Sequence, residues 1–430
     1  MPRFKAPRGT RDLLPPQRAL WSRLEATAAE LAARYGYRPI ETPLFEEAAV
    51  FERGIGAVTD VVEKELFRVS GSAGGDDRWA LRPEATAGVV RAYLEHGMQT
   101  QSQPVRLSLF GPMFRYDRPQ AGRYRQFWQW NVEAIGDPGP AIDAELIELA
   151  YRFYGRAGLR DVEILLNSIG DPTCRPAYMA ALTAYFGARE ADLPELERGR
   201  LVSNPLRLLD SKDPRMQPLI AGAPRITDAL CDACRAHFEG VQAHLAAVSV
   251  PVRIVPTLVR GLDYYTRTAF EGYVRGVEGQ QSALGGGGRY DGLVELLGGR
   301  STPGIGFALG IDRVALALQD QGTLEPEKQG PVAVVVGADR EDTAGRLAVA
   351  TELRAGGIAS RADLGVRNLS RQLEAAVKDG AHFAVILGDE LATGQVQLKD
   401  LHSGTQRLVN RTDLVRELER AQSSHRHGAS

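Results

Sequence analysis

Hydrophobic and polar positions follow helical spacing in some stretches of the chain and strand-like alternation in others. From Leu20 to Tyr35, apolar and small residues recur at helical spacing, and Gly36 follows, which predicts a helix ended by glycine. Between residues 105 and 136 the chain reads as two strands, RLSLFGPMFRYD and YRQFWQWNVEAIG, joined by the polar loop RPQAGR. This pattern predicts a long antiparallel hairpin.

The middle of the chain changes from sheet-like to helical patterning and back. A helix is expected over 143–156, followed by the strand VEILLNSIG. Residues 172–250 have helical spacing with few strand signals, and they separate two segments that both read as sheet, so we interpret them as a helical insertion. Strand character returns at 252–255 and 268–273, and GIGFALGIDRVALAL then reads as a strand, a glycine and a helix.

The last hundred residues predict a separate small domain. The polar stretch 323–330 has no apolar face to bury and is typical of a linker. Over 331–420, apolar strands such as VAVVVG and FAVILGD alternate with amphipathic helices, which indicates an α/β domain. Residues 421–430 are expected to form a disordered tail.

Composition limits the classes of protein to which the chain can belong. Its 430 residues, 43% hydrophobic and 25% charged, predict a globular protein of two or three domains. No apolar run approaches the roughly 20 residues that span a bilayer, and the basic residues of Met1–Thr10 precede no apolar stretch, so we expect a cytoplasmic protein without membrane contact.

Any nucleic-acid contact must come from a local cluster, because the formal net charge is only −2. One cluster lies between Gln103 and Gln126, where five arginines face a single acid, Asp117. The arginines are Arg106, Arg115, Arg118, Arg123 and Arg125.

The three cysteines, Cys174, Cys231 and Cys234, are too few for a disulfide framework, which agrees with a reducing compartment. Cys231 and Cys234 form a C-x-x-C with His237 three residues on, a spacing that invites a zinc site. The same stretch also places the two cysteines with Phe238 and Val241 along one side of a helix. Cys174 could join a site only if the fold brings it near, and no fourth ligand is evident. Burial of small apolar residues without metal is therefore the simpler interpretation.

The second strand of the hairpin has a distinctive polar face. Alternation places Phe127, Gln129, Asn131 and Glu133 on one side, and Trp128, Trp130 and Val132 on the other. A half-exposed sheet would explain such a face without any binding role. Arg115, on the partner strand and facing the same region, favours a site instead.

Six strings resemble those of the class II aminoacyl-tRNA synthetases, in the form used by the histidine enzymes. FRYDRPQAGRYRQF resembles motif 2, and GGGGRYDGL followed by TPGIGFALGIDRV resembles the motif 3 region. LVRGLDYYTRTAFE resembles a segment peculiar to histidyl-tRNA synthetases. LRPEATA resembles the family's amino-acid-binding loop, and GYRPIETPLFE resembles motif 1, which forms the dimer. The matches span most of the chain in the family's order.

The resemblance implies an α+β catalytic domain built on a mainly antiparallel sheet, in two parts. Residues 1–171 would carry motifs 1 and 2, and 251–322 would carry the histidine-specific segment and motif 3. The helical insertion lies between them, and 331–420 would form an α/β anticodon-binding domain. The resemblance also implies a homodimer that uses ATP, Mg²⁺, L-histidine and tRNA(His), and no metal bound by the protein's own site residues.

The chemistry of amino-acid activation explains the arginines. When the histidine carboxylate attacks the α-phosphorus of ATP, fixed guanidinium groups can stabilise the charge on the phosphate. By resemblance, Arg115 would hold the α-phosphate, Arg260 would bridge it to the substrate carboxylate, and Arg313 would lie at the adenine and γ-phosphate end. Asp117, Tyr124 and Phe127 would also bind ATP, and Arg118 and Arg123 would approach the tRNA acceptor end. For any one arginine, a surface ion pair is the alternative.

A second set of residues would select histidine, whose ammonium and imidazole both need buried partners. By resemblance, Glu84, Thr86 and Gln129 would hold the ammonium, and Glu84 and Gln129 count among the catalytic residues. Glu133 and Tyr265 would face the imidazole nitrogens, with Tyr264 close by. Sheet packing is the alternative for the two tyrosines.

Glycines 285 to 288 remove side chains where the backbone must approach a ligand or another strand. No Gly-Lys-Ser/Thr follows them, which excludes a phosphate loop, and the glycine spacing of GIGFALG does not fit a dinucleotide fingerprint.

Three positions depart from the family's pattern. Trp128 stands where histidine is common, Ala85 where glycine is usual, and Asn131 where a small residue is usual. Trp128 lies on the face opposite Gln129, so altered packing is expected there. Asn131 shares the face of the proposed binding residues and could change histidine affinity or placement of the tRNA end.

Two other functions compete with histidine charging. A regulatory paralogue that senses histidine for ATP phosphoribosyltransferase shares the catalytic fold, but it typically lacks the C-terminal domain and the RGLDYY arginine, both of which this chain has. A class II synthetase for threonine, proline or glycine is opposed by the string LVRGLDYYTRTAFE.

Overall fold

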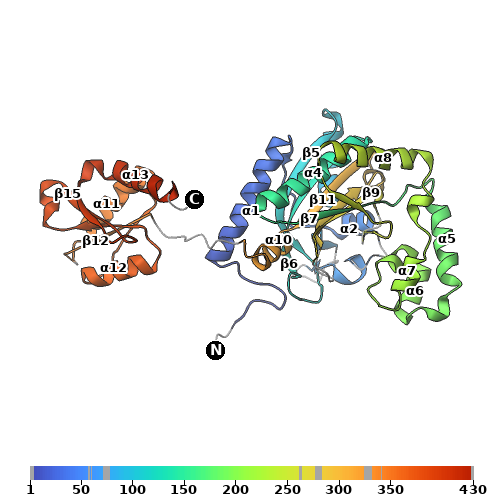
Figure 1. Cartoon of the computed structure of the whole chain (residues 1–430), viewed down its shortest axis with the longest axis horizontal. Helices are drawn as coiled ribbons and strands as arrows, with labels where there is room; N and C mark the ends of the chain where they lie inside the picture. The colour runs from blue at the N-terminus through green and yellow to red at the C-terminus, as the bar shows by residue number, and fades with distance from the viewer. Residues whose placement is uncertain are drawn as a thin grey trace. The chain divides into compact units, whose positions relative to one another are not determined.

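The computed structural model describes residues 4–56, 59, 61–70, 78–260, 264–276, 283–323, 332–339 and 341–427. The chain forms two compact units, Met1–Glu325 and Pro326–Ser430 (Figure 1). The division falls inside the stretch 323–330 that the sequence predicts to be a linker, most of which lies outside the described residues. None of the described helices is both long enough and apolar enough to cross a membrane.

The first unit is built on an eight-stranded sheet in the order β1-β5-β6-β11-β10-β9-β7-β8. The pairs β1·β5 and β7·β8 are parallel, and the other neighbours are antiparallel, so the predicted α+β class with a mainly antiparallel sheet is confirmed. The strands are β1 (Arg38–Pro39), β5 (Val105–Phe114), β6 (Gln126–Ile135), β7 (Val162–Ser168), β8 (Val252–Ile254), β9 (Thr266–Val274), β10 (Ala283–Arg289) and β11 (Gly304–Gly310).

The hairpin β5–β6 forms the spine of this sheet. Its ten residue pairs run without a shift from Val105 opposite Ile135 to Phe114 opposite Gln126. Alternating side chains fix this register, because a slip by one residue would move Trp130, which is fully buried against Phe153 and Phe307, to the opposite face of the sheet. The arginine-rich loop closes the hairpin at the end where Phe114 pairs with Gln126.

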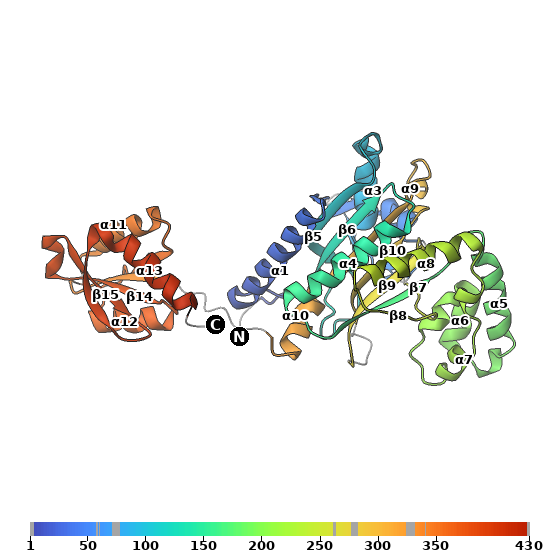
Figure 2. The same ribbon diagram turned by 45° about the horizontal axis from the view of Figure 1, so that its top comes forward.

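Helices cover both faces of the sheet. One face packs against α1 (Pro15–Arg34), α4 (Pro140–Ala157) and α10 (Ile311–Asp320) in the largest hydrophobic core (Figure 2). The other face packs against α3 (Thr86–Glu95) and α9 (Leu293–Leu296). Beside α3 lie α2 (Ala48–Ile55), a π-helical turn at Val61–Glu65 and a small sheet of β2 (Phe45–Glu47), β4 (Trp79–Leu81) and β3 (Arg68–Val69).

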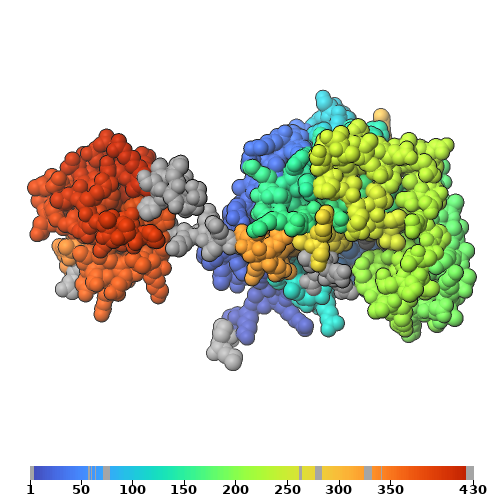
Figure 3. Space-filling model, in the orientation of Figure 1, coloured from blue at the N-terminus to red at the C-terminus, as the bar shows by residue number. Residues whose placement is uncertain are grey.

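Residues 172–250 form helices joined by short 3₁₀ turns. The helices are α5 (Arg175–Gly187), α6 (Glu195–Ser203), α7 (Gln217–Ala221) and α8 (Asp232–Ala247). Helix α8 packs along α4, and the two form one continuous surface (Figure 3). This contact fixes the last helix of residues 172–250 on the largest hydrophobic core of the first unit.

The second unit has a five-stranded sheet in the order β13-β12-β14-β15-β16. Strands β13 (Ser360–Ala362), β12 (Ala333–Gly337) and β14 (Phe383–Leu387) are parallel, whereas β15 (Gln395–Asp400) and β16 (Gln406–Asn410) are antiparallel. The unit also contains α11 (Thr343–Ala355), α12 (Leu369–Lys378) and α13 (Leu414–His427).

Helix α13 continues past the point where the sequence predicts a disordered tail. Leu414, Leu418 and Ala421 follow one another at helical spacing and pack against the core of the second unit, so the helix is still anchored at Ala421. It ends at His427, and only 428–430 lie beyond the described backbone.

Candidate active site

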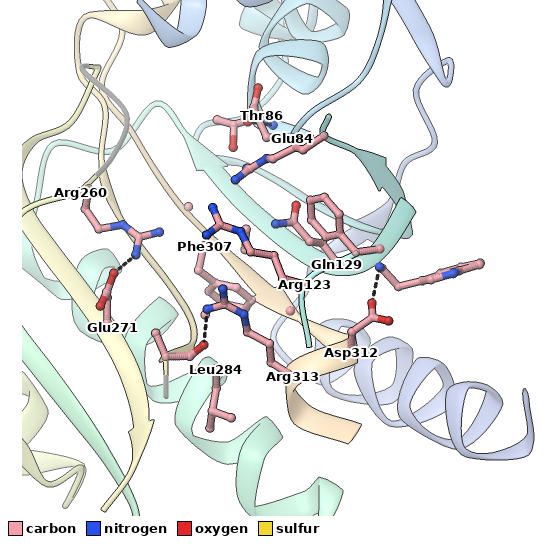
Figure 4. Close-up of a pocket in the computed structure, with 18 of the residues that line it drawn as sticks. Glu84, Thr86, Arg123, Gln129, Arg260, Glu271, Leu284, Phe307, Asp312 and Arg313 are labelled. Atoms are coloured by element: carbon pink, nitrogen blue, oxygen red, sulfur yellow. Dashed lines mark hydrogen bonds and ion pairs between the residues drawn. The ribbon is translucent and has the colours of Figure 1, made fainter. Parts of the chain in front are cut away.

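One pocket in the first unit collects most of the residues that the sequence singles out (Figure 4). It encloses about 1040 Å³ of space, including its open mouth. Its walls come from the β5–β6 hairpin, the loop before α3, Arg260, Tyr264 and Tyr265 between β8 and β9, strands β9 and β10, and the β11–α10 junction. The predicted residues that line it are Glu84, Thr86, Arg115, Asp117, Arg123, Tyr124, Phe127, Gln129, Arg260, Tyr264, Tyr265 and Arg313.

Three arginines reach the pocket from distant parts of the sequence. Arg115 follows β5, donates from Nε to the Pro83 carbonyl at 2.9 Å, and lies over the Phe127 ring. Arg313, in the first turn of α10, donates from Nη1 to the Ala283 carbonyl at 2.7 Å. In Figure 4, Arg260, Arg313 and Arg123 point toward a common space, with Glu84 and Thr86 at its other end.

The positive charges repel one another. Burial lowers the pKa of Arg313, and the nearby Arg123 and Arg115 lower it further. Burial likewise lowers the pKa of Arg115, although Glu65 and Glu84 oppose the change. A guanidinium group nevertheless stays charged near neutral pH. The arrangement therefore favours an anion in the space between these side chains.

Arg260 also lines the pocket. Its Nη1 pairs with Glu271 on β9, whose other carboxylate oxygen accepts a hydrogen bond from Tyr273. Its Nε is buried and has no partner among the described residues. A buried donor without a partner is costly, so this group is suited to an acceptor on a ligand.

The opposite end of the pocket offers acceptors. Glu84 accepts the backbone N–H groups of Thr86 at 2.7 Å and Ala87 at 2.9 Å, so its carboxylate sits at the N-terminus of α3. The Oε1 atom of Gln129 is buried and lacks a partner among the described residues. A carboxylate and a free carbonyl oxygen form a suitable site for an ammonium group.

Glu133 lies directly behind the pocket wall and does not line it. It is 1% exposed, and it accepts hydrogen bonds from Thr86 Oγ1 at 2.7 Å and Tyr290 at 2.6 Å. Burial raises the pKa of Glu133 to about 8; the two hydrogen bonds oppose this rise, and Glu84 adds to it. At neutral pH a protonated carboxyl group is therefore the favoured form.

Tyr264, Tyr265 and Tyr290 form an aromatic cluster beside Glu133. The ring centroids of Tyr264 and Tyr265 lie 4.6 Å apart, and those of Tyr264 and Tyr290 lie 6.0 Å apart. Burial raises the pKa of all three hydroxyl groups, so they remain protonated and can donate. The cluster gives the pocket a flat apolar wall with polar tips.

Glycines make room for these side chains. A Cβ on Gly306 would lie 1.7 Å from Glu133 Oε2, and one on Gly288 would lie 2.9 Å from the Tyr265 ring. A Cβ on Gly286 would meet both the backbone of Phe270 and the Arg260 guanidinium. The glycine run is therefore a strand, β10, whose even-numbered members clear space for site residues and whose odd-numbered members pack on β11.

The loop between β5 and β6 holds the remaining predicted residues. Arg123 forms an ion pair with Asp117, and Arg118 is exposed beside them. Tyr124 accepts a hydrogen bond from Arg11 at 2.8 Å. Arg11 also pairs with Asp312 at 2.6 Å, so the N-terminal segment links the hairpin loop to the start of α10.

Sequence reasoning assigned no role to Arg11, Glu271, Tyr290 or Asp312. Glu271 and Tyr290 stand inside the strings TRTAFE and GGRYDG, but their partners come from other strands, and the strings alone do not reveal them. The one sequence signal for Asp312 was its place as an acidic residue in the first turn of the helix. In the structure, its Oδ2 accepts the backbone N–H of Trp128 at 2.7 Å.

The three departures from the family's pattern lie close to the site. Trp128 packs on the core of the opposite sheet face and also touches the pocket. Ala85 is buried at the start of α3. Asn131 is buried outside the pocket lining, and both its amide atoms lack partners among the described residues. Asn131 therefore does not contact the pocket as its place on the strand suggested.

The cysteines lie outside this pocket, and their arrangement differs from the one the sequence suggested. Cys231 precedes α8 as its N-cap and is not a member of the helix's apolar face, on which Cys234, Phe238 and Val241 are buried. His237 instead pairs with Asp143 at 2.8 Å, in a buried cluster with Arg289.

Comparisons with known proteins agree with this geometry. A family described as Histidyl-tRNA synthetase matches residues 9–171 and 212–314, and one described as Anticodon binding domain matches 331–421. The chain is 48% identical to the histidine–tRNA ligase of Moorella thermoacetica, over 94% of this chain and 95% of the relative. It is also 48% identical to that of Desulforudis audaxviator, over 96% of this chain and 98% of the relative.

A solved structure agrees over nearly the full length. The crystal structure of the S. aureus histidyl-tRNA synthetase superposes with a TM-score of 0.79 and 36% identity. It covers 96% of this chain and 99% of the other.

Proposed function

The chain belongs to the histidyl-tRNA synthetase family, and we propose that its pocket joins L-histidine to ATP as histidyl-adenylate before histidine passes to the 3′ end of tRNA(His). The observation that carries the proposal is one pocket with converging guanidinium groups at one end and a buried carboxyl–tyrosine cluster beside the other. The regulatory paralogue is not favoured, because relatives named histidine–tRNA ligase match over nearly the full length.

The arginines would act on the phosphate. A carboxylate oxygen of histidine attacks the α-phosphorus, a P–O bond to pyrophosphate breaks, and the two electrons leave with pyrophosphate. Arg115 and Arg260 both line the pocket and would stabilise the negative charge on the α-phosphate oxygens. The unpartnered Nε of Arg260 would then receive its acceptor from the substrate carboxylate or phosphate. Arg313 would hold the adenine and γ-phosphate end, together with Asp117, Tyr124 and Phe127.

The acceptors at the other end would hold the amino acid. Glu84, Gln129 and Thr86 would bind its ammonium group, and the two carboxylate oxygens of Glu84 are already held in place by the first N–H groups of α3. Glu133 and Tyr265 would face the imidazole, with Tyr264 against its ring. Because Glu133 lies behind the pocket wall, it would reach a ring nitrogen only by giving up a hydrogen bond with Thr86 or Tyr290. A protonated Glu133 could then donate to the ring, and an ionised one could accept from it.

The family uses ATP and divalent metal ions in general. We propose Mg²⁺ in particular, because this ion is commonly bound through one or two carboxylates together with substrate phosphates. Asp117 and Glu271 line the pocket and would hold it. The ion would neutralise part of the polyphosphate charge.

The tRNA would contact two regions. Arg118 and Arg123 lie in the hairpin loop at the pocket mouth, where the acceptor end must arrive for histidine to be transferred. Residues 331–420 would read the anticodon. Residues 1–171 and 251–322 would form the two parts of the catalytic domain, and 172–250 would form the insertion between them.

We also propose that the protein is a cytoplasmic homodimer. Leu44, Phe45 and Trp79 are 42%, 49% and 47% exposed and form an apolar patch within and beside the string that resembles motif 1. Such a patch is typical of an interface. None of the three cysteines forms a disulfide, which is compatible with a reducing compartment.

ATP–pyrophosphate exchange by the purified chain tests the proposal. Exchange that requires L-histidine supports it. Exchange with threonine, proline or glycine would identify a different synthetase, and no exchange with any amino acid would indicate a sensor. Light scattering of the same sample, compared with a Phe45→Asp variant, tests the dimer.

A further inference from the structure

All three cysteines of the chain meet in one cluster with Asp171. The potential ligand atoms of Asp171, Cys174, Cys231 and Cys234 all lie within 4.8 Å of one another. Cys174 and Cys234 are buried, and the Asp171 side chain is 13% exposed. The fold thus supplies both the proximity of Cys174 and the fourth ligand that the sequence alone did not reveal.

The spacing of the ligand atoms matches a tetrahedral zinc site. Zn–S bonds of about 2.3 Å and Zn–O bonds of about 2.1 Å give tetrahedral edges of about 3.6 to 3.8 Å. The Sγ atom of Cys174 lies 3.7 Å from Asp171 Oδ1, and the Sγ atom of Cys231 lies 3.9 Å from the same oxygen. The other four ligand–ligand distances are at most 4.8 Å.

The backbone around the cluster brings the ligands into place. Gly170 has a φ of +67°, and a Cβ there would lie 2.8 Å from Cys174 Sγ, so glycine permits the close approach of this sulfur. The N–H of Asp171 points at the same sulfur at 3.5 Å, and the N–H of Thr173 donates to Asp171 Oδ1 at 3.0 Å. Hydrogen bonds from N–H groups to ligand atoms orient the ligands of metal sites.

Arg267, which is outside the ligand set, would offset part of the negative charge of the four ligands. Arg267 Nη2 lies 3.3 Å from Asp171 Oδ2, and its Nε is buried without a partner among the described residues. Three thiolates and a carboxylate around Zn²⁺ would carry a net charge of −2, which a guanidinium at this position partly offsets. Arg267 also has a positive φ of 50°, a conformation that few non-glycine residues adopt.

We propose that Asp171, Cys174, Cys231 and Cys234 bind one structural Zn²⁺ ion that joins the two ends of the helical insertion to the catalytic sheet. Asp171 and Cys174 lie at the start of the insertion, and Cys231 lies 60 positions after Asp171, where the last helix begins. Three thiolates with a single carboxylate favour zinc over magnesium or calcium, and two of the three cysteines, Cys174 and Cys234, are buried. All four positions are filled by protein groups, which is the arrangement of a structural site.

The same site supports the turn beside the active pocket. Arg267 N–H donates to the Gly170 carbonyl, and Ile169 N–H donates to the Arg267 carbonyl, both at 2.7 Å. Arg175, one residue after Cys174, donates to the carbonyls of Gly170 and Tyr265. Zinc would therefore hold the turn on which Tyr265 rests.

Metal analysis of the full-length chain, purified under reducing conditions without chelator, tests the proposal. We expect about one zinc per chain, as for other closed sites of this kind. Because the chain has only these three cysteines, an alkylating reagent should modify none of them in the native protein and all three after chelator and denaturant. Cobalt added to the chelated protein should give thiolate-to-cobalt charge-transfer bands and the visible bands of tetrahedral cobalt.

Variants identify the ligands. The variants Cys174→Ser, Cys231→Ser and Asp171→Asn should lose most of the zinc. The control His244→Gln, on the exposed side of α8, should retain it. The cobalt spectrum of the wild-type chain decides the matter if a cysteine variant fails to fold. Wild-type protein that contains no zinc, and whose three thiols react freely or form a disulfide with no cobalt spectrum, would overturn the proposal. So would a Cys174→Ser protein with full zinc.

Discussion

The hydroxyl group of Tyr290 donates a 2.6 Å hydrogen bond to the carboxyl group of Glu133. This bond joins strand β6 to the residue that follows β10. Thr86, at the start of α3, donates a second hydrogen bond to the same carboxyl group. Three segments that are far apart in the sequence thus meet at one buried carboxyl group, whose pKa burial raises to about 8. The proposed histidine pocket depends on the ionisation of this group.

Glu133→Gln should change how stability depends on pH. In the native wild type the pKa is about 8, against about 4.3 in an unfolded chain. Between these values the native state holds a proton that the unfolded state lacks. The free energy of unfolding therefore falls as pH rises through this window, by at most about 1.4 kcal/mol per pH unit, and levels off above it. Glutamine has no such proton, so the variant should gain stability relative to the wild type as pH rises.

Urea unfolding of both proteins at several pH values between about 5 and 9 measures the difference in free energy across this window. A difference that does not change with pH would mean that Glu133 is ionised throughout.

Gly306→Ala should disturb the site through a steric clash. The new methyl group would lie 1.7 Å from Glu133 Oε2 and 2.8 Å from the Val132 carbonyl, so Glu133 must move. We expect a loss of about 1 to 3 kcal/mol in the free energy of unfolding, typical of overpacking, and a higher KM for histidine. The control is Gly199→Ala in the exposed face of α6, where a Cβ meets nothing within 4 Å. Equal thermal midpoints for the two variants would contradict the clash.

Sequence patterns predict the parts of the fold in which side chains alternate. The β5–β6 hairpin was predictable because its register follows from the period of two in QFWQWNVEAI. Strand β10 has no alternation to detect, because four of its residues are glycines. Helix α13 extends beyond Ala421 because that alanine packs on a core built by other elements, which the local polar composition does not reveal.

The site was predictable where a string resembles a family motif, and not where packing creates the role. Arg115, Arg260 and Arg313 could be named because each stands in such a string. Arg11 pairs with Asp312, which lies 301 positions later in the sequence, and no local pattern predicts that contact. Asp171 likewise joins the cysteines only through the fold, which is why no fourth ligand was evident from spacing alone.

Deletion of Pro331 onward should separate activation from tRNA charging. The first unit has its own hydrophobic cores and contains the whole pocket, so histidine-dependent pyrophosphate exchange should remain close to that of the full chain. Charging of tRNA(His) should fall, because the proposed anticodon contacts are lost. Both rates can be measured on the same preparation. Full charging by the truncated chain would refute the role of the second unit.

The most direct test of convergent guanidinium groups is the rate of histidyl-adenylate formation in Arg260→Ala, measured in a single turnover with saturating ATP and histidine. We expect a rate at least about 100-fold below wild type, because removing one donor to the charge that develops in a transition state has an effect of this size. Arg253→Ala, which removes an exposed arginine on β8, serves as the control and should keep the wild-type rate. A wild-type rate in folded Arg260→Ala would contradict the account.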